Sequence, residues 1–75
     1  MYLLKKEFLN LFKEIRTSVY TNYLGCDQTF ISSILNGNKI CSEVIAKALI
    51  SVKFDISFKS PSMETYLKQY FAKEK

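Results

Sequence analysis

The fold of this chain is decided by residues 17–37, which read TSVYTNYLGCDQTFISSILNG. The spacing of apolar residues predicts two short amphipathic helices, with Gly25 between them. A glycine fits this position because many helices end on a left-handed residue, which glycine adopts without strain. Thr17 or Ser18 is expected to cap the first helix through its hydroxyl, and Asp27 to cap the second.

The two helices differ in how they end. The first has four apolar residues at helical spacing: Val19, Tyr20, Tyr23 and Leu24. The second closes on an Asn-Gly pair, which either ends the helix by the same left-handed mechanism or forms a hairpin turn. The flanking residues do not alternate between apolar and polar as strands do, so the helix end is favoured.

The second predicted helix, 28–35, has two unlike faces. Its apolar face is formed by Phe30, Ile31, Ile34 and Leu35. Its other face carries the neutral polar side chains of Gln28, Thr29, Ser32, Ser33 and Asn36. A solvated surface helix usually carries Lys and Glu there, whereas amide and hydroxyl groups can donate and accept at base edges in a groove about 12 Å wide. This pattern favours a DNA-reading helix over a surface helix that has little charge by accident.

The rest of the chain is also predicted to be mainly helical. Two glycines and one proline leave few helix breakers. Apolar stripes at helical spacing predict helices over about 4–16 and 61–72, and a further helix that Ser42 caps. The helix after Ser42 has the expected buried stripe Val44, Ile45, Ala48, Leu49 and Val52. Residues 52–59 alternate between apolar and polar, so they fit a short strand or an irregular segment about equally.

Composition places the chain among small globular domains. It has 75 residues, of which 24% are charged and 48% hydrophobic, typical of one folded domain. A domain of this size buries only about 60–65% of its unfolded surface, which leaves little room for an enclosed active site. There is no His, no pair of carboxylates at helical spacing and no glycine-rich phosphate loop. We therefore expect no enzyme, no catalytic residue, no cofactor and no metal site.

Charge and cysteine content bear on partner and compartment. The formal net charge of +4 is mildly basic, which is compatible with a polyanion partner. No apolar stretch approaches the roughly 18 residues of a membrane span, and the N-terminus has no signal-peptide core. Cys26 and Cys41 are interpreted as plain small apolar residues. We expect a soluble, cytoplasmic protein with no membrane partner.

Part of the sequence resembles a known family. The pattern consists of Tyr20, Leu24-Gly25-Cys26, Ile31 and Ile34, followed by Leu35-Asn36-Gly37. It is similar to the helix-turn-helix of phage repressors of the lambda repressor/Cro type, the XRE-like family. Residues 46–49 look like that family's fourth helix, so the resemblance covers roughly 12–50, about half the chain. Thr21 departs from the pattern, because the family prefers Ala or another very small residue there.

The resemblance implies an architecture. It is a compact, all-α, lambda-repressor-like domain of about five helices. Residues 1–59 would form the helix-turn-helix DNA-binding domain. Residues 60–75 lie outside the resemblance, and their apolar stripe predicts a C-terminal helix for packing or dimerisation.

The resemblance also implies roles for individual residues. The helix that opens at Gln28 would enter the major groove, while the helix before it would touch the DNA backbone. Gln28 would be the main base reader, bidentate to an adenine, and Thr29 and Ser32 would make secondary base contacts. Ser33 would make a further, less defined contact. The backbone contacts would come from Thr17, Asn36 and Lys39.

Charge is the feature that weakens a DNA interpretation. Between residues 17 and 38 there is no Lys or Arg, and the only charge is Asp27. Phosphate neutralisation supplies most non-specific DNA affinity. Here it would come from residues at the margins: Lys5, Lys6, Lys13, Arg16 and Lys39. We therefore expect a weak monomer and a homodimer on double-stranded DNA, joined through the last helix or residues 52–59.

Two functions stay open from the sequence. The first is a repressor- or Cro-like transcription regulator that occupies operator DNA. The second is a small phage- or mobile-element-encoded inhibitor that uses the same scaffold to bind a host defence protein. The missing positive charge between residues 17 and 38 favours the second.

Overall fold

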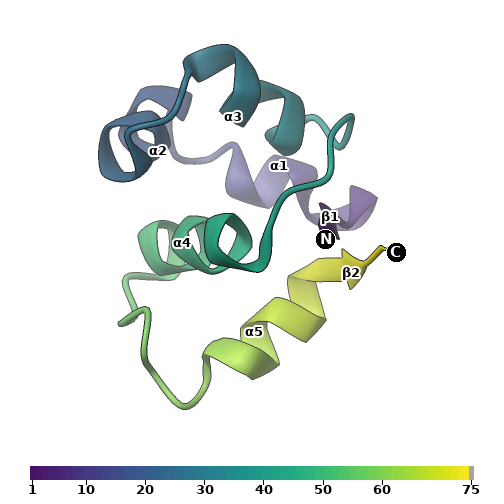
Figure 1. The fold of residues 1–75 in the computed structure, drawn as a ribbon, viewed down its shortest axis with the longest axis vertical. Helices are drawn as coiled ribbons and strands as arrows, with labels where there is room; N and C mark the ends of the chain where they lie inside the picture. Colours follow the sequence, from purple (N-terminus) through teal and green to yellow (C-terminus); the bar gives the residue numbers. More distant parts are fainter. Residues whose placement is uncertain (75) are drawn as a thin grey trace.

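The computed structural model describes residues 1–74, which form a mostly helical domain (Figure 1). In chain order its elements are β1 (Tyr2–Leu4), the 3-10 helix η1 (Lys6–Phe8), α1 (Leu9–Phe12), α2 (Thr17–Leu24), α3 (Gln28–Leu35), α4 (Glu43–Phe54), α5 (Met63–Tyr70) and β2 (Phe71–Lys73). The fold therefore has the predicted five α-helices within residues 1–74, and it also has a small sheet that was not predicted at these positions. None of the described helices is long and apolar enough to cross a membrane.

α2 and α3 lie at one end of the molecule and are joined by a short turn (Figure 1). Gly25 ends α2 with φ +69°, and its N–H donates to the carbonyl of Thr21 at 2.7 Å. Asp27 then caps α3 by accepting a hydrogen bond from the Thr29 amide at 3.1 Å. The predicted helix end at Gly25 and the predicted cap at Asp27 are both confirmed. The predicted hydroxyl cap on α2 is wrong, because Thr17 is already helical and Arg16 occupies the cap position without a side-chain hydrogen bond.

The Asn-Gly pair ends α3 and forms no hairpin. Gly37 has φ +75°, and its N–H donates to the carbonyl of Ile34 at 3.0 Å. The N–H of Asn38 donates to the carbonyl of Ser33 at 3.0 Å. This pair of bonds is the Schellman arrangement, in which a left-handed glycine lets the chain satisfy the last helical carbonyls.

The predicted helix over 4–16 is only partly correct. Leu4 lies in β1, and α1 itself covers only Leu9–Phe12 after a 3-10 turn. Strand pairing with β2 overrides the helical pattern, because the N–H of Lys5 donates to the carbonyl of Tyr70 at 3.0 Å. The helix ends at Phe12, whose carbonyl accepts a hydrogen bond from the buried Tyr20 hydroxyl at 2.7 Å.

The two chain ends meet in a two-stranded antiparallel sheet. β1 pairs with β2 in the register Tyr2↔Lys73, Leu3↔Ala72 and Leu4↔Phe71. Tyr2 also exchanges backbone hydrogen bonds with Cys41, at 2.7 and 2.8 Å, so β1 is bonded along both edges. The predicted helix over 61–72 is therefore shorter than expected at both ends. Residues 61–62 form a turn before α5 begins at Met63, and the last residues leave α5 to form β2.

The predicted strand alternative for residues 52–59 is wrong. α4 continues through Val52 to Phe54 and ends at Asp55, which has a left-handed φ of 55°. Beyond Asp55 the chain forms turns, and the Ser51 hydroxyl secures them by donating to the carbonyl of Ile56 at 2.6 Å. Of the two aromatics in this stretch, Phe54 packs against the core, whereas Phe58 stays 37% exposed.

All helices share one hydrophobic core. Its fully buried members include Phe12, Tyr20, Ile31, Ile34, Leu49, Met63, Leu67 and Phe71. Phe12 makes edge-to-face contacts with Phe54, Tyr70 and Phe71, at centroid distances of 5.9, 5.8 and 5.7 Å. Met63, Leu67 and Phe71 thus belong to the same core as the buried residues of 1–59. The stripe predicted after Ser42 is partly wrong, because Val44 is 62% exposed while Ala46 and Ile50 are buried.

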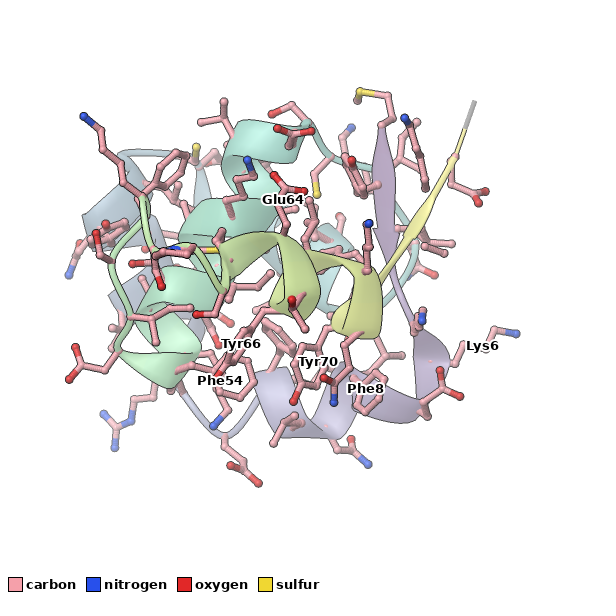
Figure 2. The ribbon with its side chains drawn as sticks, turned by 90° about the horizontal axis from the view of Figure 1, so that it is seen from below. Lys6, Phe8, Phe54, Glu64, Tyr66 and Tyr70 are labelled. Atoms are coloured by element: carbon pink, nitrogen blue, oxygen red, sulfur yellow. The ribbon has the colours of Figure 1, made fainter. Side chains whose placement is uncertain are left out.

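An aromatic row packs against this core, between η1, α4 and α5. Figure 2 shows Phe8, Tyr70, Phe54 and Tyr66 along one face of the molecule. Phe8 meets Tyr70 edge-on at 4.7 Å, and Phe54 stacks on Tyr70 at 4.9 Å. These contacts pack α5 against η1 and α4.

Candidate nucleic-acid interface

α3 presents a polar face to solvent, at the end of the molecule opposite α5 (Figure 1). Ile31, Ile34 and Leu35 face inward and are at most 2% exposed. Gln28, Thr29 and Asn36 are exposed, while Ser32 and Ser33 are half-buried. The structure therefore brings together on α3 the four predicted base contacts, Gln28, Thr29, Ser32 and Ser33, with Asn36 at the C-cap.

The first turn of α3 holds the best-placed polar groups. Gln28 and Thr29 follow the Asp27 cap directly, and no described residue hydrogen-bonds the Gln28 amide group. That amide is therefore available to donate and accept at once, as bidentate recognition of a base requires. The Asp27 carboxylate lies next to it, and its charge repels a phosphate backbone.

The later turns of α3 use part of their hydrogen-bonding capacity internally. The Ser33 hydroxyl donates to the carbonyl of Thr29 at 3.0 Å, so its proton is already engaged. The Asn36 amide donates to the Ser32 hydroxyl oxygen at 3.5 Å, which leaves the Ser32 proton available. Ser32 is therefore the better base contact of the two serines.

Two of the three predicted backbone contacts, Thr17 and Lys39, lie beside this face, whereas Asn36 lies at its end. Thr17 is the first residue of α2 and is half-buried. Lys39 lies in the loop after α3, and its Nζ sits 5.5 Å from the centroid of the Phe30 ring. This cation–π contact holds a positive charge beside α3 while Lys39 remains exposed.

Two exposed apolar residues on α2 were not predicted. Val19 is 46% exposed and Tyr23 is 58% exposed, although their spacing fits the same stripe as the buried Tyr20. They are four residues apart, so they lie on one side of the helix. The spacing alone could not have revealed this, because the apolar residues of α3 have the same spacing and none of them is exposed.

Several lysines are unavailable to the polar face of α3. Lys47 bridges Glu43 and Glu64, and Lys53 pairs with Glu14 at 3.2 Å. Lys5 donates to the carbonyl of Lys68 on α5, at 3.1 Å. Lys5 was expected among the phosphate contacts, but this bond holds it against the helix at the opposite end of the molecule (Figure 1).

The described residues offer no metal site, and no known protein matches the chain. Within residues 1–74 no three His, Cys, Asp or Glu side chains are grouped so that they could hold a metal ion. No family model, no curated protein and no solved structure matches the chain. Its function is therefore inferred from its own residues.

Proposed function

We propose that this chain is a cytoplasmic, sequence-specific DNA-binding regulator of transcription that occupies operator DNA with α3 in the major groove. α2, the Gly25 turn and α3 would act as a helix-turn-helix of the lambda repressor/Cro type. The single observation that carries the proposal is the exposed, uncharged, hydrogen-bonding face of α3, which begins at Gln28. The role requires no catalytic residue and no cofactor.

The proposed contacts follow from the side-chain chemistry. The Gln28 amide would pair with the N6 and N7 atoms of an adenine, and Thr29 and Ser32 would contact neighbouring bases. Ser33 would contribute less, because its proton is engaged by Thr29. Thr17, Asn36 and Lys39 would fix the helix on the sugar–phosphate backbone, which positions the reading face without selecting sequence.

We further propose that two copies bind a pseudo-palindromic site about 34 Å from centre to centre. One domain offers few cations near α3, so a second one is needed to raise affinity. Met63, Leu67 and Phe71 are buried in their own domain, so this stripe of the last helix is occupied already. The 52–59 segment, with Phe58 37% exposed, is the better contact between copies.

Selection of bound sequences from a pool of random duplexes tests the proposal. The wild-type chain should enrich a palindromic motif. Gln28→Ala should enrich the same motif with one position relaxed, because each bidentate base contact contributes about 1–3 kcal/mol of discrimination. No enrichment, or identical motifs from the two proteins, would contradict it.

A protein-binding role is the second candidate, and a specific observation favours it. Val19 and Tyr23 expose apolar surface on α2, beside a region that has no Lys or Arg from residue 17 to 38. Such a surface suits a protein partner, for example a host defence protein that a phage- or mobile-element-encoded inhibitor blocks. Salt separates the two roles. Affinity for DNA should fall steeply between low and moderate salt, whereas an apolar protein interface responds little.

A further inference from the structure

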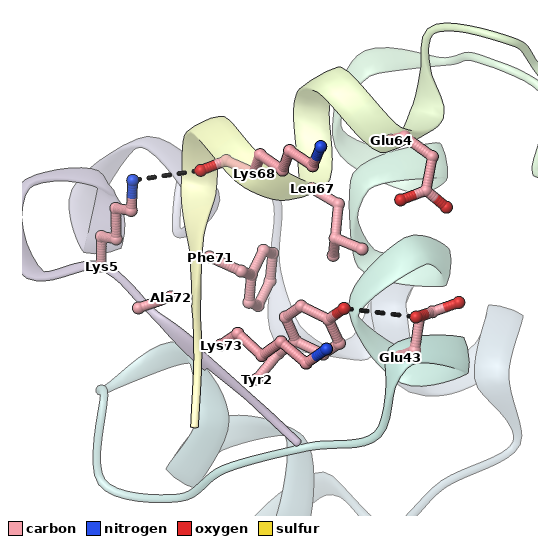
Figure 3. Close-up of a pocket in the computed structure, with 9 residues that line it drawn as sticks. All are labelled: Tyr2, Lys5, Glu43, Glu64, Leu67, Lys68, Phe71, Ala72 and Lys73. Atoms are coloured by element: carbon pink, nitrogen blue, oxygen red, sulfur yellow. Dashed lines mark hydrogen bonds between the residues drawn. The ribbon is translucent and has the colours of Figure 1, made fainter. Parts of the chain in front are cut away.

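A groove lies along β2 on the side of the molecule away from α3. We call it the β2 groove; its walls include Tyr2, Lys5, Leu67, Lys68, Phe71 and Lys73, and its volume is about 670 Å³. In Figure 3, β2 runs through the middle of this groove, with Lys5 on one side and Tyr2 and Glu43 on the other. Of the apolar residues that line it, Leu67 and Phe71 are buried, and Tyr2 and Ala72 are half-buried.

β2 has an open edge facing away from β1. Met1 and Glu74 form one bonded pair, with the Glu74 N–H donating to the Met1 carbonyl at 2.7 Å. Bonded and non-bonded pairs alternate along an antiparallel ladder. The backbone N–H and C=O of Lys73 therefore point outward, and no described residue hydrogen-bonds them. β1 has no such edge, because Tyr2 is bonded to Cys41.

The uncompensated charge of the β2 groove is positive. Lys5, Lys68 and Lys73 form no ion pair with any described carboxylate. The two glutamates of the groove share one cation, since Lys47 Nζ lies 3.0 Å from Glu43 and 2.9 Å from Glu64. One of these two negative charges is therefore left over against the three positive charges of Lys5, Lys68 and Lys73, and the balance stays positive. The hydrogen bond from Lys47 also holds the pKa of Glu43 below its usual value.

We propose that the β2 groove binds an extended acidic peptide segment of a partner protein, which adds to β2 as a third strand. The peptide backbone would bond to the open N–H and C=O of Lys73, as in other cases of strand addition. Alternate side chains of the peptide would lie on opposite faces of the sheet, one set beside Lys73 and Tyr2 and the other beside Ala72. This surface is separate from α3, so it is independent of the proposed DNA contact.

A second copy of the same chain is a poorer occupant of this edge. Pairing two β2 strands would bring Lys68 and Lys73 of one copy close to the same residues of the other. Like charges across an interface disfavour association. The glutamate and aspartate side chains of an acidic peptide would instead complement the positive charge of the lysines. Charged residues on an edge strand are a common way in which proteins avoid pairing with themselves.

The test uses the whole chain, labelled with ¹⁵N, and three fluorescent peptides of equal length. The first alternates Glu and Val, the second alternates Lys and Val, and the third is the Glu-Val peptide with N-methyl groups on alternate amides. We expect only the first to bind and to shift the amide signals of residues 71–74. A Lys68→Glu/Lys73→Glu double variant should weaken its binding at least about tenfold. The matched Lys13→Glu/Lys59→Glu variant changes net charge equally outside the groove and should alter binding less than about twofold.

Each other outcome would overturn the proposal. Unshifted amides of residues 71–74 in saturating Glu-Val peptide would mean that the groove takes no such strand. Equal binding of the N-methylated peptide would mean that no strand is added. Concentration-dependent protection of the Lys73 amide without peptide would identify a second copy as the occupant. The wild-type titration needs no variant, so its result stands even if a charge reversal unfolds the chain.

Discussion

Tyr20 links the first helix to the second through one buried hydroxyl. Its side chain is fully buried, and the hydroxyl donates to the Phe12 carbonyl at 2.7 Å. That carbonyl lies at the end of α1, where helical carbonyls lack intrahelical partners. Burial raises the pKa of the Tyr20 hydroxyl far above its usual value, so the group stays protonated and able to donate.

Tyr20→Phe should therefore destabilise the fold. The substitution keeps the ring but leaves the buried Phe12 carbonyl without its donor, which costs about 1–3 kcal/mol. Urea unfolding followed by circular dichroism measures the loss. Tyr23→Phe is the matched control, because Tyr23 is 58% exposed and should change stability by less than about 0.5 kcal/mol. Equal stability of Tyr20→Phe and wild type would show that the hydrogen bond contributes nothing.

Cys41 should make the fold sensitive to alkali. Burial raises the pKa of its thiol from about 9 to about 11, while the nearby N-terminal ammonium acts in the opposite direction. The raised pKa contributes stability that is complete below about pH 9 and is lost as the pH rises through about 11, on the order of 2 kcal/mol. The free energy of unfolding of the wild-type chain should fall between pH 8 and pH 11. That of the Cys41→Ala variant should fall less steeply over the same range. An identical slope in both proteins would contradict this assignment.

Asp27 has two separable effects, a helix cap and a negative charge. Asp27→Asn keeps an oxygen for the Thr29 amide, so stability should stay within about 1 kcal/mol. It also removes the only charge between residues 17 and 38, so affinity for duplex DNA at low salt should rise about three- to tenfold. Fluorescence anisotropy with a labelled duplex measures this. Asp55→Asn removes one charge at the end of α4, and an equal rise there would show that only net charge matters.

Local capping signals predicted some helix ends and failed at the start of α2, where neither Thr17 nor Ser18 is the cap. Gly25 and Ser42 each act within a few residues, and both behave as predicted, with the Ser42 hydroxyl accepting from the Ile45 amide at 3.3 Å. The face of α3 from Gln28 onward was predictable for the same reason. β1 and β2 were not predictable, because Leu4 and Phe71 pair across almost the whole chain. Their side chains also fit the helical stripes of neighbouring residues, so no local pattern marks them as strands.

The turn between α2 and α3 depends on the conformation of Gly25. Its φ of +69° is unfavourable for any residue with a Cβ, although no atom lies within 4 Å of where the Cβ would be. Gly25→Ala should therefore cost about 1 kcal/mol of unfolding free energy through backbone strain alone. Gly25→Asn should cost less, since Asn tolerates the left-handed region. An alanine variant as stable as wild type would show that the turn relaxes away from this conformation.

In the whole molecule, α3 lies at the end opposite α5 (Figure 1), and α5 carries Lys68 of the β2 groove (Figure 3). Duplex DNA attracted by net charge alone would therefore approach a different surface from DNA that is read by α3. The shared core holds both surfaces in one rigid unit, since α5 and β2 pack on the helices that support α3. The location of bound DNA thus discriminates between specific and merely electrostatic binding.

The most direct measurement is an amide chemical-shift titration of the ¹⁵N-labelled chain with the duplex most enriched from the random pool. The proposed function predicts the largest shifts at Gln28, Thr29 and Ser32, with smaller ones at Lys39, and weaker binding as salt rises. Shifts confined to Lys5, Lys68 and Lys73, or none at saturating duplex, would contradict the claim that α3 reads DNA.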